Sequence, residues 1–75
     1  MIISKENCPH CQKAIAMIER AGYEYVEYKI GKTITREEAL EMAPGARSVP
    51  QIFDGKTHVG GYNELIGYLG ADNVN

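Results

Sequence analysis

The feature that most constrains this chain is its single pair of cysteines, Cys8 and Cys11, which enclose the dipeptide Pro9-His10. A short apolar stretch, residues 1–3, precedes the pair, and a stretch with apolar residues spaced three and four apart follows it. Pro9 suits the first turn of a helix, where its missing N–H costs no hydrogen bond. The cysteines therefore lie where a predicted strand runs directly into a predicted helix.

The predicted helix covers residues 9–21 and ends at Gly22, which suits the left-handed position just past a helix. Its apolar face consists of Cys11, Ala14, Ile15, Ile18 and Ala21. Residues 23–30 are rich in β-branched and aromatic side chains and predict a second strand, with Val26, Tyr28 and Ile30 on one side.

A second helix is predicted after Thr35, which forms a capping box with Glu38. Its apolar face consists of Ala39, Leu40, Met42 and Ala43, and Pro44-Gly45 ends it. Two further strands, residues 49–53 and 56–60, flank Asp54-Gly55, a pair that favours a type I′ hairpin turn. A last helix is expected to start with Asn63 as its N-cap, to bury Leu65, Ile66 and Leu69, and to end before Gly70.

The element order is β-α-β-α-β-β-α, which predicts an α/β fold with a four-stranded mixed sheet and helices on both faces. A chain of 75 residues without an internal repeat forms one domain, residues 1–75. The net charge is −2 and the eight Lys and Arg are spread along the chain, so we expect neither a nucleic-acid nor a membrane partner. The N-terminal residues do not have the pattern of a signal peptide, and we expect an intracellular protein.

In a reducing compartment, two cysteines are not a disulfide scaffold, and their position favours redox chemistry. Cys8 lies at the start of the helix, where free N–H groups and the helix dipole stabilise a thiolate, so Cys8 is the predicted nucleophile. Cys11 lies one turn later on the apolar face and is the predicted resolving thiol. Pro9 restricts the turn, and His10 is expected to stabilise the Cys8 thiolate further and to make the disulfide easier to reduce.

Three other interpretations of the pair stay open at this point. A zinc site needs about four ligands, and His10 and His58 are the only histidines in the chain, so we expect no metal. An iron–sulfur cluster shared by two chains requires a thiolate that leans outward, which the rigid Pro9 disfavours. Two core cysteines without chemistry are the remaining alternative.

Three motifs in a fixed order make the sequence resemble the dithiol glutaredoxins of the thioredoxin superfamily. They are Cys8-Pro9-His10-Cys11, Ser48-Val49-Pro50 and Gly60-Gly61-Tyr62-Asn63. The resemblance implies a thioredoxin-like fold, a cis peptide bond at Pro50 beside the nucleophile, and a Val49 backbone that pairs with substrate. Ser48 replaces the usual threonine, and His10 stands where the family commonly has tyrosine.

The resemblance also implies a glutathione site with a group for each carboxylate of the tripeptide. Lys5 and Arg47 match positions that hold the glycine carboxylate, and the backbone of Tyr62 and Asn63, after the close-approaching Gly61, matches the site for the γ-glutamyl carboxylate. Read singly, each of these residues is also an ordinary surface, capping or turn residue. Their joint placement favours a glutathione site.

The predicted function is glutathione-dependent reduction of protein disulfides and glutathione mixed disulfides by the Cys8/Cys11 dithiol, in a cytoplasmic monomer. The expected partners are glutathione and disulfide-bearing or glutathionylated proteins. The family resemblance suggests ribonucleotide reductase as one of these proteins. The short chain fits a trimmed version of the kind a viral genome carries. The alternatives are a redoxin reduced by thioredoxin reductase, an oxidase of the DsbA type, which shares the Cys-Pro-His-Cys tetrad, and an iron–sulfur-binding module.

Overall fold

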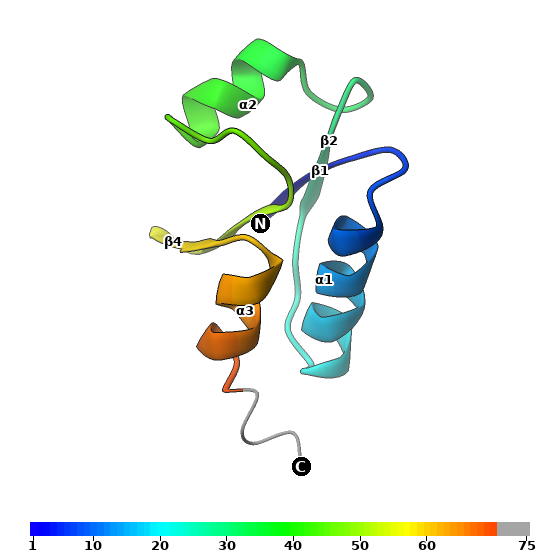
Figure 1. Cartoon of the computed structure of the whole chain (residues 1–75), viewed down its shortest axis with the longest axis vertical. Coiled ribbons are helices and arrows are strands. Elements are labelled where there is room, and N and C mark those ends of the chain that lie inside the picture. Colours follow the sequence, from blue (N-terminus) through cyan, green and yellow to red (C-terminus); the bar gives the residue numbers. More distant parts are fainter. Residues whose placement is uncertain (71–75) are drawn as a thin grey trace.

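The computed structural model describes residues 1–70, which form four strands and three helices in the predicted order (Figure 1). The elements are β1 (Ile2–Lys5), α1 (Pro9–Arg20), β2 (Glu27–Ile30), α2 (Arg36–Met42), β3 (Gln51–Asp54), β4 (Thr57–Gly60) and α3 (Tyr62–Tyr68). The last five residues of the predicted domain, 71–75, lie outside the described part.

The four strands form one mixed sheet in the order β2-β1-β3-β4. Strand β1 pairs with β2 in parallel and with β3 antiparallel, and β3 pairs with β4 antiparallel. The central β1 alternates its side chains between the two faces of the sheet, as a strand must. Ile2 packs with α1 and α3 on one face, and Ile3 packs with α2 on the other. The predicted thioredoxin-like α/β fold, with helices on both faces, is confirmed.

Local sequence signals fix the ends of two helices as predicted. The Thr35 side chain accepts from the Glu38 N–H at 3.0 Å, while the Glu38 carboxylate accepts from the Thr35 N–H at 2.7 Å, so the predicted capping box starts α2. Gly22 follows α1 with a φ of 86°, in the left-handed region that favours glycine. These bonds satisfy backbone groups that the helices cannot satisfy themselves.

The predicted N-cap of the last helix is wrong. Helix α3 begins at Tyr62 with Gly61 as its N-cap, and Asn63 is the second residue of the helix. The reason is Glu64, whose carboxylate accepts from the Gly61 N–H at 2.8 Å and so fixes the helix start two residues earlier than predicted.

Two further details of the strands differ from the prediction. Strand β2 begins only at Glu27, opposite Ile2 at the start of its one partner β1, although the Val26 carbonyl just before it still accepts from the Ile2 N–H at 2.9 Å. The hairpin pairs Asp54 with Thr57, so its two central residues are Gly55 and Lys56 rather than Asp54 and Gly55. Only Gly55 has a positive φ, 60°, which matches a type II′ turn instead of type I′.

Two side chains predicted to be buried are exposed. Ala21 is the C-cap that follows the last residue of α1, and its side chain is exposed. Leu40 in α2 is 48% exposed, although its neighbours in the predicted apolar face, Ala39 and Ala43, are buried. Among residues 1–70, no helix has the length and apolar character that a membrane crossing requires.

Candidate redox site

Cys8 is itself the N-cap of α1, with extended backbone angles of −118° and 96°. Its sulfur accepts a hydrogen bond from the Cys11 N–H at 3.2 Å, so it occupies the position that a Ser or Asp oxygen holds in most helices. The two cysteines form a disulfide with a Cα–Cα distance of 5.2 Å. One turn of helix therefore holds both sulfurs close enough to bond, and Cys8 lies at the helix start as predicted.

The two sulfurs have different surroundings at the start of α1. Once the disulfide is reduced, the Cys8 sulfur lies beside the free N–H groups and the positive end of α1, which favour its thiolate. Cys11 lies on the buried face of α1 with Ala14 and Ile18 and is 2% exposed, against 6% for Cys8. This geometry suits Cys8 as the attacking thiolate and Cys11 as the thiol that acts second.

The segment Ser48-Val49-Pro50 leads into β3, with the predicted cis peptide bond between Val49 and Pro50. The side-chain amide of Gln51 donates to the Ser48 carbonyl at 2.9 Å, and His58 Nε2 lies 2.7 Å from the Gln51 carbonyl oxygen. The His58 ring is exposed and also stacks on Phe53, with ring centroids 4.4 Å apart. Sequence reasoning missed Gln51, whose contact with His58 depends on how β3 and β4 pair.

The third motif approaches the second through its glycines. A Cβ on Gly61 would lie 3.5 Å from the Pro50 carbonyl oxygen, and one on Gly60, whose φ is 122°, would lie 2.8 Å from the Glu64 side chain. At the neighbouring position, Tyr62 stacks on His10 with ring centroids 5.6 Å apart. The starts of α1 and α3 and the Pro50 turn thus converge, although they are far apart in the sequence.

A groove of about 530 Å³ brings the two predicted cationic residues together. Lys5 at the end of β1 and Arg47 in the segment before Val49 both line it, and so does Arg36 at the start of α2. Sequence reasoning missed Arg36, because nothing local indicates which way the first turn of α2 faces. The described residues give none of these three cations an ion-pair partner.

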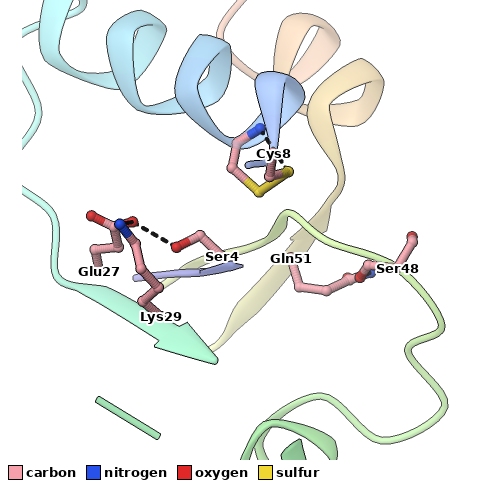
Figure 2. Close-up of a disulfide and its surroundings, with 7 residues drawn as sticks. Ser4, Cys8, Glu27, Lys29, Ser48 and Gln51 are labelled. Carbon is pink, nitrogen blue, oxygen red and sulfur yellow. Dashed lines mark hydrogen bonds and ion pairs between the residues drawn. A yellow bond between two sulfur atoms is a disulfide. The ribbon is translucent and has the colours of Figure 1, made fainter. Parts of the chain in front are cut away.

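Below the disulfide in the view of Figure 2, a partly buried polar pair connects β1 to β2. Ser4 is fully buried, and its hydroxyl donates to the Glu27 carboxylate at 2.6 Å. Lys29 lies 3.9 Å from the same carboxylate oxygen. Sequence reasoning also missed this pair, since the partners are 23 residues apart and meet only through the parallel pairing of the strands.

Metal-binding side chains do not gather at the site. Within residues 1–70, no three His, Cys, Asp or Glu side chains come together as a metal centre requires. Among the predicted site residues, Lys5, Pro9, His10, Arg47 and Asn63 are exposed, Val49, Gly61 and Tyr62 are half-buried, and Pro50 is buried with the two cysteines. Apart from Lys5 at the end of β1, they lie at the starts of α1 and α3 and in the segment that leads to Pro50.

Comparison with known proteins gives one consistent result. Residues 1–59 match the sequence model of the glutaredoxin family. A probable glutaredoxin of Synechocystis is 39% identical over 71 residues, covering 93% of this chain and 81% of its own length. Glutaredoxin 3 of Escherichia coli is 34% identical, with 85% and 77% covered, and glutaredoxin-1 of Variola virus is 37% identical, with 87% and 66% covered.

Proposed function

Since the chain belongs to the glutaredoxin family and is a thiol–disulfide oxidoreductase with a Cys8/Cys11 pair, we propose that glutathione is its reductant and part of its substrate. The substrates are protein disulfides and mixed disulfides between proteins and glutathione. We further propose that it acts in the cytoplasm as a monomer, and ribonucleotide reductase is the protein substrate that the family resemblance suggests.

The observation that carries this proposal is the presence of two separate sets of donors, cations that line a groove and free N–H groups at a helix start. Glutathione has a carboxylate at each end, and the cysteine sulfur lies between them. In the first set, Lys5 and Arg47 line the groove beside Val49 and supply charge-assisted donors for the glycine carboxylate. In the second set, the first-turn N–H groups of α3 at Tyr62 and Asn63 have no carbonyl partner within the helix and suit the γ-glutamyl carboxylate.

Glu64 adds a counter-charge that the sequence interpretation did not consider. Its carboxylate lies at the Gly61 N–H, next to the proposed site of the γ-glutamyl group. That group carries an ammonium as well as a carboxylate, so an acidic side chain beside the helix start complements its positive charge.

The reaction proceeds by two thiolate exchanges. The Cys8 thiolate attacks the glutathione sulfur of a mixed disulfide, the S–S bond breaks, and the protein sulfur leaves as a thiolate that takes up a proton. A second glutathione thiolate then attacks the glutathione sulfur bound to Cys8, which yields oxidised glutathione and the free Cys8 thiolate. With a protein disulfide, the Cys8 thiolate first bonds to one protein sulfur and releases the other; Cys11 then attacks Cys8, which breaks the Cys8–protein bond and releases the second protein thiol. Two glutathione molecules then reduce the resulting Cys8–Cys11 disulfide and become oxidised glutathione.

The test is reduction of a glutathionylated protein and of a protein disulfide, with glutathione, glutathione reductase and NADPH. We expect Cys8→Ser to abolish both activities. We expect Cys11→Ser to retain the first and lose the second, because only the second reaction needs the resolving thiol. Equal loss of both activities in the two variants would refute this division of roles.

The source of electrons is tested separately with the oxidised protein. Incubation with glutathione and glutathione reductase should reduce Cys8–Cys11, whereas reduction by thioredoxin reductase alone would overturn the proposal. In Lys5→Gln and Arg47→Gln, the KM for the glutathionylated substrate should rise about two- to fivefold each, as expected for exposed charge pairs. The matched control is Lys56→Gln, which removes the same charge at the hairpin tip and should leave the KM unchanged.

A further inference from the structure

The groove beside Val49 has two kinds of lining. Its apolar walls come from β1, β2, α2 and the segment after α2, and consist of Ile3, Ile30, Ala39, Ala43, Ala46 and Val49. Three cations line it as well, Lys5, Arg36 and Arg47, and Leu40 contributes a side chain that is 48% exposed. The groove thus combines three cations with an apolar lining in which Ile30, Ala46 and Val49 are half-buried and Leu40 is exposed.

Glutathione can satisfy only part of this lining. Its side chains are a γ-linked glutamate, a cysteine and a glycine, so it has no apolar side chain to cover the walls that α2 and Ile30 provide. Its glycine end carries one carboxylate, while the groove holds three cations. Apolar surface left in water is unfavourable by roughly 25 cal/mol per Å², which favours an occupant that brings an apolar side chain.

The cations are available for an external anion. In residues 1–70 the ion pairs join Lys29 to Glu27 and Lys32 to Glu6, and neither pair includes a cation of the groove. The acidic residues of α2 do not line the groove either, and Glu38 is held in the capping box by Thr35. Charge complementarity therefore favours a carboxylate-bearing partner.

We propose that this groove docks the segment of a protein substrate that follows the target cysteine, with an apolar side chain against α2 and one or more carboxylates at Arg36. The chain direction of the docked peptide rests on the proposed function. In glutathione the glycine follows the cysteine, and the glycine carboxylate is assigned to Lys5 and Arg47. A longer peptide in the same orientation has further residues after this point, and Arg36 is the one cation of the groove that glutathione is not assigned to. The preferred substrates are disulfides whose cysteine is followed by apolar and acidic residues.

The test uses the dithiol protein, reduced in advance and freed of reductant, and needs no glutathione. The substrates are short peptides whose cysteine is disulfide-bonded to thionitrobenzoate, a coloured leaving group. Cys8 bonds to the peptide sulfur, thionitrobenzoate leaves with the electron pair, and Cys11 then displaces the peptide thiol as the Cys8–Cys11 disulfide forms. Stopped-flow absorbance gives the second-order rate constant.

Three peptides separate the features of the groove: Ser-Gly-Cys-Gly-Leu-Glu-Glu, the same peptide with Gln in place of Glu, and one with Glu-Glu-Leu placed before the cysteine. We expect the first to react about three- to tenfold faster than the other two. Arg36→Gln should remove most of that advantage, whereas Leu40→Ser should slow the first two peptides alike, because both carry leucine after the cysteine. Lys56→Gln, with the same loss of charge outside the groove, should leave the advantage intact.

Equal rates for the three peptides, a preference for the peptide with acidic residues before the cysteine, or an equal loss in Lys56→Gln would overturn the docking proposal. Arg36 and Leu40 are exposed, so their variants should fold, and circular dichroism checks that they do. Failure of glutathione to reduce the Cys8–Cys11 disulfide would count against the proposed function alone, because the peptide preference is measured without glutathione.

Discussion

Removing the Glu27 carboxylate should destabilise the fold more than removing the hydroxyl that binds to it. The Ser4 hydroxyl is fully buried and donates to Glu27 at 2.6 Å (Figure 2). Glu27→Ala leaves this hydroxyl buried without an acceptor, whereas Ser4→Ala leaves a partly exposed carboxylate that water can solvate. The double variant contains neither group, so it should be more stable than Glu27→Ala alone.

The magnitudes are large enough to measure. A buried unsatisfied hydroxyl costs about 1–3 kcal/mol, and the net contribution of an ordinary hydrogen bond is about 1 kcal/mol. A domain of 75 residues has a free energy of unfolding of roughly 4–11 kcal/mol, so Glu27→Ala removes a substantial share of it. Adding Ser4→Ala should restore about 1 kcal/mol. Glu27→Ala and the double variant both lack the ion pair to Lys29, so this pair does not contribute to the difference in stability between them.

Urea unfolding of the oxidised protein, followed by far-UV circular dichroism, measures these differences. With a slope of about 1 kcal/mol per M for a small domain, the expected midpoint order is Ser4→Ala highest, then the double variant, then Glu27→Ala, at intervals of roughly 1 M. Lys29→Ala is the control for the ion pair and should change the midpoint little. A double variant no more stable than Glu27→Ala would refute the reasoning.

Three further predictions concern the surface of the site and the far end of the sheet. His10→Tyr should make the reduction potential of Cys8–Cys11 more negative, by on the order of 30 mV for a tenfold change in equilibrium constant, as measured in glutathione redox buffers; a less negative potential would contradict the role given to His10. Gln51→Leu removes the bond that holds the Ser48 carbonyl and should raise the KM for a protein disulfide about threefold at unchanged kcat, while an unchanged KM would show that the segment is positioned without it. The hydrogen bond that Tyr68 donates to Asp54 at 2.6 Å raises the pKa of Tyr68 above 10.0, so the neutral phenol is favoured in the folded state. The stability that this bond contributes is complete below pH 10 and is lost as the pH rises through the raised pKa of Tyr68 in the folded state. In urea titrations, the stability of Tyr68→Phe should therefore fall less at alkaline pH than that of the parent protein.

The order of the elements was predictable because it depends on local chemistry. The capping box at Thr35, the left-handed Gly22 and the apolar spacing in α1 act within a few residues, and the structure has all three. The wrong prediction for the start of α3 also has a local cause, because two neighbouring residues can each cap the helix. Asn63 is a good N-cap by type, but Glu64 can cap Gly61 through its side chain, and that arrangement determines where α3 begins.

The predicted site was incomplete because some of its contacts depend on pairing between distant strands. The motif residues could be found from the sequence, since the family resemblance identifies them. Ser4 meets Glu27 only because β1 and β2 pair in parallel, and Gln51 meets His58 only because β3 and β4 form a hairpin with an extra residue in β4. Hydrophobic periodicity indicates which face a residue occupies, and it does not indicate which residue lies opposite.

Leu40 is a case in which hydrophobic periodicity alone gives the wrong burial, and it lies in the proposed docking groove. Helical spacing predicts one apolar face for α2, yet Ala39 and Ala43 are buried while Leu40 is 48% exposed. The two buried residues pack with Ile3, and the groove of about 530 Å³ beside them is lined by the exposed Leu40 and the half-buried Ile30. Arg36 and Leu40, four residues apart, lie on the same flank of α2 and line this groove. An apolar side chain that a purely structural helix would bury thus remains accessible next to a cation, and this departure from the simple pattern occurs where we propose that substrates dock.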